Sequence, residues 1–167
     1  MEALTADDIR ACIVNCSKGE AKRLALPRDL AGRPWDDLDF FGWRDPSGSD
    51  RGGVVAEHDG TLFGIVLRVV TAPSARFAGG RFAGARSTMC SLCLTTHPGG
   101  GVTLMAAPRR ANRDNTVGIR ICADFACSLY ARGLKDAPSG GRMPETVTIE
   151  EKTGRIRDSL GAFLEKI

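Results

Sequence analysis

Two closely spaced pairs of cysteines constrain this chain more than any other feature. The first pair is Cys90-Ser-Leu-Cys93, and the second pair, Cys122-Ala-Asp-Phe-Ala-Cys127, follows after 28 intervening residues. The chain opens with an acidic segment rather than a basic stretch followed by an apolar one. We therefore expect no secretory signal and place the protein in the reducing cytoplasm. Paired cysteines there are more often metal ligands than disulfides, so the four thiolates predict one tetrahedral structural zinc site.

The spacing of the second pair requires a change of backbone conformation between its two members. On a continuous helix, an offset of five residues would rotate the side chains about 140° apart, and both could not face one ion. β-branched residues before Cys122 indicate a strand, and Asp124 can cap a helix that begins at Phe125. Cys127 then lies in the first helical turn, where the helix dipole favours a thiolate.

The segment between the pairs predicts a hairpin. Residues 99–108 have the pattern of a strand behind a glycine turn, and residues 109–115 form a polar tip. A Cys-x-x-Cys turn, then a hairpin, then a helix that carries the last ligand is the treble-clef zinc-finger arrangement. Four unrelated buried thiols, a disulfide, a redox Cys-x-x-Cys centre and an iron–sulfur cluster are the alternatives. The redox centre lacks a thioredoxin-like βαβ context, whereas an iron–sulfur cluster uses the same ligand type and stays open.

The other thiols and the two histidines each allow two interpretations. Cys12 and Cys16 lie one turn apart in a predicted helix and could hold a metal, but their apolar neighbours favour ordinary core thiols. His97 follows Cys93 closely and could compete as a ligand, whereas His58 is expected on the surface of a hairpin. A catalytic zinc keeps one position open, and the chain has no Ser/His/Asp set or His-Glu-x-x-His motif. We therefore expect a protein that is not an enzyme and has no small-molecule substrate.

The whole chain predicts an α+β fold in four segments. These are an N-terminal α+β module (1–72), a linker (73–86), the treble-clef finger (87–135), and a loop with a C-terminal helix (136–167).

Within these segments, apolar periodicity predicts a helix over residues 5–24 and a closing helix from about residue 149 to 166. Thr148 and Glu151 form a capping box for the closing helix. Residues 35–43 predict an aromatic core, with a partner-binding patch as the alternative. Residues 54–70 predict a β-hairpin that turns at Asp59-Gly60.

Charge is unevenly distributed along the chain. Residues 1–60 contain 8 Lys/Arg and 12 Asp/Glu, a net charge of −4, whereas residues 86–135 contain 7 Lys/Arg and 2 Asp, a net charge of +5. The finger is therefore the basic part of the chain, which points to RNA, DNA or an acidic protein as partner. The sequence contains no run of 18 apolar residues, so we expect no transmembrane helix.

The finger resembles the FBP family, which is the C-terminal treble-clef domain of FusB-type elongation factor G-binding proteins. The resemblance covers about 50 residues. Its motifs are Cys90-Ser-Leu-Cys93-Leu-Thr-Thr-His97, Gly101-Val-Thr-Leu-Met-Ala, and Asn115 through Cys122-Ala-Asp-Phe-Ala-Cys127-Ser-Leu-Tyr130-Ala-Arg-Gly133. Ahead of the finger, Asn15-Cys-Ser-Lys-Gly-Glu and Gly42-Trp-Arg-Asp-Pro46 are similar to short, stand-alone actinobacterial members.

The resemblance implies a structural zinc held by Cys90, Cys93, Cys122 and Cys127, and a contact between the finger and elongation factor G. In FusB-type proteins this contact promotes release of the factor from the ribosome and gives fusidic acid resistance. The well-known members carry an N-terminal helical bundle, where this sequence predicts one helix and a β-hairpin.

Six residues of the finger are the predicted contacts to the factor. They are Arg109, Arg110, Arg113, Tyr130, Arg132 and Lys135, of which Tyr130 and Arg132 belong to the matching motif. In the alternative function, an RNA- or ribosome-binding zinc finger, the same arginines would contact phosphates. The finger has only two aromatic rings, so base stacking would be poor. A redox or metal-storage protein, the third possibility, predicts labile metal and reactive thiols.

Overall fold

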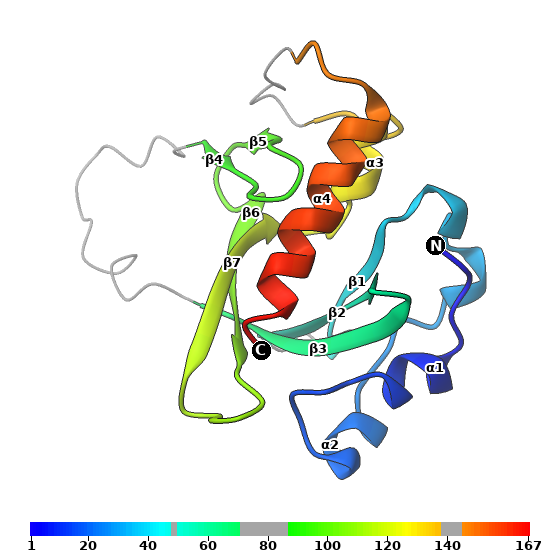
Figure 1. The fold of residues 1–167 in the computed structure, drawn as a ribbon, viewed down its shortest axis with the longest axis vertical. Coiled ribbons are helices and arrows are strands. Elements are labelled where there is room, and N and C mark those ends of the chain that lie inside the picture. Colours follow the sequence, from blue (N-terminus) through cyan, green and yellow to red (C-terminus); the bar gives the residue numbers. More distant parts are fainter. Residues whose placement is uncertain (48–49, 71–86, 138–144) are drawn as a thin grey trace.

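The computed structural model describes residues 1–47, 50–70, 87–137 and 145–167. The predicted linker over 73–86 lies outside the described residues, as does most of the predicted loop before the closing helix. Among the described residues, no helix has both the length and the apolar character needed to cross a membrane. The elements, in chain order, are α1 (Ala6–Ala11), α2 (Lys18–Lys22), η1 (Leu30–Gly32), η2 (Trp35–Asp37), β1 (Phe40–Arg44), β2 (Arg51–His58), β3 (Thr61–Val69), β4 (Thr88–Met89), β5 (Thr96–His97), β6 (Val102–Pro108), β7 (Thr116–Cys122), α3 (Cys127–Arg132) and α4 (Ile149–Leu164). These helices and antiparallel strands form the α+β fold that was predicted (Figure 1).

One antiparallel sheet runs through both halves of the chain in the order β1-β2-β3-β6-β7. β2 and β3 form the predicted hairpin, with Asp59 and Gly60 at positive φ in its turn. β3 then pairs with β6 of the finger through Arg68↔Ala106 and Val69↔Met105. The segments 1–72 and 87–135, predicted as two modules, therefore contribute strands to the same sheet.

The two faces of the β1–β2–β3 part bury two separate apolar clusters, because successive side chains of a strand point to opposite faces. Phe40, Val54 and Leu67 lie in the cluster shared with the finger and α4. Phe41 and Trp43 lie in the other cluster, against α1 and the N-terminal loops. The aromatic segment predicted as core is thus buried, and alternate side chains of its strand lie on opposite faces of the sheet.

The helix predicted over residues 5–24 is two short helices. Capping boxes begin α1 at Thr5 and α2 at Ser17. Between them the backbone leaves the helix and pairs with β3, since Val14 N–H donates to Gly64 O and Gly64 N–H donates to Cys12 O. A Cβ at Gly64 would lie 2.7 Å from Cys12 Sγ, so this close approach requires glycine.

α4 covers the finger side of the sheet, and its C-terminal end lies beside β3 (Figure 1). Its predicted capping box between Thr148 and Glu151 is present. The helix buries Ile156, Leu160, Phe163 and Leu164, whereas Ile149 is 48% exposed. His58, expected on the hairpin surface, packs against α4 at Gly161 instead, 3.5 Å from Glu165.

Candidate metal centre

Four short segments position the four cysteines. Cys90 and Cys93 lie in the turn between β4 and β5, Cys122 ends β7, and Cys127 begins α3. The β4–β5 turn is closed by Leu94 N–H donating to Cys90 O, with Leu94 at φ 56°. A hydrogen bond from Ser91 N–H to Arg120 O joins this turn to β7. The finger hairpin therefore holds one pair of cysteines against the other.

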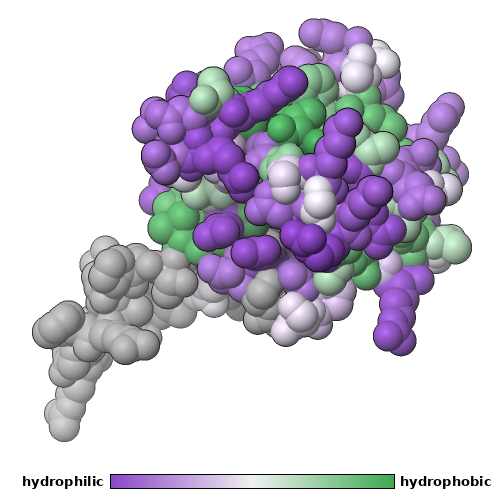
Figure 2. Space-filling model, turned by 90° about the horizontal axis from the view of Figure 1, so that it is seen from below, coloured by the Kyte–Doolittle hydropathy of each residue, from purple (hydrophilic) through white to green (hydrophobic). Residues whose placement is uncertain are grey.

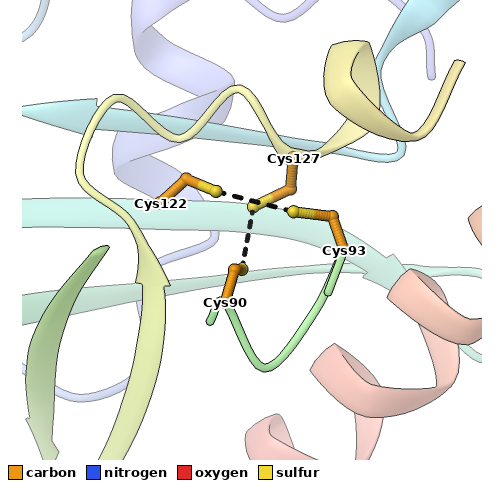
Figure 3. A group of neighbouring side chains, drawn as sticks. All are labelled: Cys90, Cys93, Cys122 and Cys127. Atoms are coloured by element: carbon orange, nitrogen blue, oxygen red, sulfur yellow. Dashed lines mark hydrogen bonds between the residues drawn. The ribbon is translucent and has the colours of Figure 1, made fainter. Parts of the chain in front are cut away.

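The four sulfurs converge on one point (Figure 3). Cys90 Sγ lies 3.6 Å from Cys127 Sγ, and Cys93 Sγ lies 3.5 Å from Cys122 Sγ. All four ligand atoms lie within 4.8 Å of one another, and all four residues are buried. Zinc–thiolate bonds of about 2.3 Å place tetrahedral sulfurs about 3.8 Å apart, so this arrangement fits one zinc ion.

Four thiolates at this site need a compensating cation. Burial and the neighbouring sulfurs raise the pKa of the Cys127 thiol well above its usual value. Hydrogen bonds from the Cys122, Cys127 and Cys93 thiols lower the pKa of Cys90. One buried thiolate can thus be stabilised by neighbouring thiols, but four cannot without a compensating positive charge. Zinc supplies that charge when bound and is coordinatively closed by four thiolates.

The five-residue spacing of the second pair is accommodated by a tight turn rather than by an early helix. The helix predicted to begin at Phe125 begins at Cys127, because Phe125 adopts φ 57°, a left-handed conformation. Asp124 accepts a hydrogen bond from Ala126 N–H at 3.1 Å, which stabilises the turn. Gly133, at φ 72°, ends α3.

His97 supports a ligand instead of joining the cysteine cluster. It is 2% exposed, and its Nε2 lies 3.3 Å from Cys122 Sγ. Its ring meets the ring of Tyr130 edge-on, with centroids 5.1 Å apart. Such a hydrogen bond to a metal ligand orients the ligand. Cys12 and Cys16 are half-buried free thiols outside the cluster.

Three of the predicted partner contacts, on or just after α3, have intramolecular partners. Tyr130 is 4% exposed, and its hydroxyl donates to Asp124 at 2.8 Å. Lys135 also donates to Asp124 at 2.8 Å and lies over the Tyr130 ring. Arg132 binds both carboxylate oxygens of Asp39, at 2.6 and 3.0 Å.

Asp39 is the structural residue that the sequence did not reveal. Its carboxylate is 3% exposed and pairs with Arg132 of α3 and Arg157 of α4, while its backbone N–H donates to Ser128. It therefore joins the N-terminal half to both helices. In the sequence it is one of three aspartates within residues 36–39, and no local signal distinguishes it.

The other three predicted contacts lie at the exposed tip of the β6–β7 hairpin. Arg109 and Arg110 have exposed side chains, with no side-chain partner among residues the structure describes. Arg113 forms a long ion pair with Glu20, at 3.4 Å. Arg109 and Arg110 are therefore the predicted contacts most available to a partner.

The comparisons with known proteins agree with this geometry. Residues 8–167 match the model of a family described as FBP C-terminal treble-clef zinc-finger. The match includes the N-terminal strands as well as the cysteine segment. No curated protein and no solved structure matches the chain. With four buried cysteines arranged for one structural metal ion, the chain belongs to the FBP C-terminal treble-clef zinc-finger family.

Proposed function

We propose that this protein is a non-catalytic, zinc-stabilised adaptor of the cytoplasm that binds elongation factor G through the tip of its finger hairpin. The observation that carries the proposal is the position of Arg109 and Arg110. Both are exposed on a hairpin whose other end is anchored by the cysteine cluster. Family membership supports a protein partner.

The chemistry of the metal site supports a structural role. A zinc ion bound by four thiolates has no open position for water or substrate. Cys90, Cys122 and Cys127 are 0% exposed and Cys93 is 2% exposed, so a substrate has no access to the sulfurs. The ion then serves to hold the hairpin and α3 in one orientation.

The surface of the finger suits an acidic partner. The tip carries Arg109, Arg110 and Arg113, and Asp114 is the acidic residue among positions 109–115. Exposed arginines of this kind mainly raise the association rate with an oppositely charged face. Tyr130, Arg132 and Lys135 would contribute indirectly, by fixing α3 against Asp124 and Asp39.

Binding kinetics with purified elongation factor G test the proposal. The double variant Arg109→Gln/Arg110→Gln should lower the association rate constant by about tenfold or more at low salt, with a smaller effect at high salt. The matched control is Arg28→Gln/Arg44→Gln, which removes the same charge from another exposed surface and should bind like the wild type. Absence of binding by the wild-type chain, or equal losses in both variants, would refute the proposed contact.

A second measurement addresses the consequence of binding. If the protein promotes release of the factor, adding it to ribosomes stalled with elongation factor G and fusidic acid should accelerate dissociation of the factor in a sedimentation assay. Binding without faster release would limit the function to association with the factor.

A further inference from the structure

A second basic surface lies at the end of the molecule where α2 and the tip of the β6–β7 hairpin are found (Figure 1). Viewed from that end, the surface is predominantly hydrophilic (Figure 2). A cleft of about 300 Å³ opens here. Four arginines from four different segments line it: Arg23 after α2, Arg51 at the start of β2, Arg68 near the end of β3, and Arg113 in the β6–β7 tip.

The acidic residues in the cleft wall do not balance these arginines. Among the described lining residues, Glu20 and Asp45 are the acids, so these residues carry a net charge of +2. The Glu20 carboxylate already accepts hydrogen bonds from Ser17 as well as from Arg113. Arg23 and Arg68 have no ion-pair partner within the described parts of the chain. An anion in the cleft would relieve the repulsion among the guanidinium groups.

The floor of the cleft is rigid. Asn15 is 3% exposed, and its side chain is fully engaged: Nδ2 donates to Val66 O at 2.9 Å and to Pro108 O at 3.4 Å, and Oδ1 accepts from Val66 N–H at 2.8 Å. These bonds hold β3 and the end of β6 at a fixed separation. The strand positions that carry Arg51 and Arg68 are directly paired. The cleft is therefore preorganised to receive an anion.

The lining favours a phosphate over a carboxylate. A tetrahedral phosphate presents oxygens in several directions and can accept from guanidinium forks on different sides, whereas a planar carboxylate matches one fork. None of the described residues that line the cleft is aromatic, so they offer no surface on which a base could stack. These features suit contacts to a sugar–phosphate backbone.

A neighbouring cleft extends the positive surface beyond one phosphate. It has a volume of about 370 Å³, is lined by Lys18 and Lys22 of α2, and shares Cys16 with the arginine cleft. The two clefts flank α2 and meet at this residue. We propose that the arginine cleft binds backbone phosphates of a single-stranded RNA, with the lysines of α2 contacting the adjoining stretch. This site is separate from the metal centre and shares Arg113 with the hairpin tip proposed to contact elongation factor G.

The test uses the full-length zinc-loaded protein and a labelled, unstructured RNA oligonucleotide, with affinity measured by fluorescence anisotropy over a salt series. Arg23→Gln/Arg68→Gln removes two cationic side chains, and the slope of log affinity against log salt should become shallower by about 1.4, since each phosphate contact contributes about 0.7 for single strands. Between 50 and 200 mM salt, the wild type should then lose about sevenfold more affinity than the variant.

The controls separate this site from general surface charge. Both arginines are exposed, so the variant should keep the wild-type melting curve. Arg28→Gln/Arg44→Gln removes the same charge from a different cleft and should keep the wild-type salt slope. Pyrophosphate should displace the RNA more effectively than poly-glutamate at equal charge concentration.

Three outcomes would overturn the inference. The first is a salt slope for Arg23→Gln/Arg68→Gln that equals the wild-type slope. The second is an equal decrease in the salt slope of the control variant Arg28→Gln/Arg44→Gln. The third is stronger displacement of the RNA by poly-glutamate than by pyrophosphate, which would assign the cleft to an acidic peptide. Binding of elongation factor G by Arg23→Gln/Arg68→Gln is measured in parallel. It should match the wild type, so a failure of the RNA site is distinguishable from a failure of the proposed function.

Discussion

Replacing Gly42 by alanine would test whether the N-terminal strands support the metal centre. A Cβ on Gly42 of β1 would lie 2.4 Å from Cδ1 and 2.5 Å from Cγ of Phe125. Ordinary van der Waals contacts begin at about 3.4 Å, so the ring has to move by about 1 Å. Phe125 is 4% exposed and lies in the turn between the ligands Cys122 and Cys127. The displacement is therefore transmitted to the turn that positions both sulfurs.

The expected cost follows from overpacking of a filled core. Inserting a methyl group into such a site typically costs about 1–3 kcal/mol. If the cost falls on the metal-bound conformation, zinc should bind about 5- to 150-fold more weakly, because about 1.4 kcal/mol corresponds to a tenfold change in affinity. The free energy of unfolding of the zinc-loaded protein should fall by a similar amount.

Zinc affinity would be measured by competition with a chromophoric chelator, and stability by urea unfolding. Gly53→Ala is the matched control, because its Cβ would lie 2.3 Å from the ring of Trp43, in the apolar cluster on the other face of the sheet. It should lower stability without weakening zinc binding. Gly32→Ala meets no atom within 4 Å and should change neither quantity.

Zinc binding by Gly42→Ala as tight as that of the wild type would refute a link between β1 and the metal centre. Equally weakened zinc binding by Gly53→Ala would also refute it, because the effect would then reflect general destabilisation and not the contact with Phe125.

Four further predictions concern other parts of the structure. Elemental analysis should find about one zinc per chain, and a strong chelator should unfold the finger, as circular dichroism would show. Asp39→Asn should lower the free energy of unfolding by about 2–4 kcal/mol, because Arg132, which is 19% exposed, loses its charged partner. Arg157→Gln should lower it by less than about 1 kcal/mol, because the Arg157 side chain is 56% exposed. Leu160→Ala should cost about 2–5 kcal/mol by urea unfolding, since Leu160 is 2% exposed, but Ile149→Ala, at a position 48% exposed, should change stability by less than about 0.5 kcal/mol. Burial raises the pKa of Cys12 to about 11. The rate at which Cys12 is alkylated, followed by mass spectrometry, should therefore rise about tenfold for each pH unit between about pH 8 and pH 10. A pH-independent rate would contradict this.

Features that depend on neighbouring residues could be predicted from the sequence. The hairpin turn at Asp59-Gly60 and the capping box at Thr148 each need only a few adjacent residues with the right backbone preferences. The cysteine cluster was predictable for a related reason. Each Cys pair is local, and the chemistry of four thiolates makes their convergence on one ion the favoured arrangement.

The interruption of the predicted N-terminal helix shows where local preference is overridden. The apolar spacing from Ile9 to Cys16 is compatible with a continuous helix. The chain instead pairs its backbone with Gly64 in β3, a residue that no local window includes. The absence of a side chain at this distant strand position permits the pairing.

The amino-acid sequence by itself determined the metal ligands, the hairpins and the capping box of α4, because their free energies depend on residues close together in the chain. Only the tertiary structure decided that the finger shares a sheet with the N-terminal strands, that Asp39 joins α3 to α4, and that four arginines line one cleft. Asp39 and Arg132 are 93 positions apart, and such pairings depend on packing of the whole core rather than on local preference.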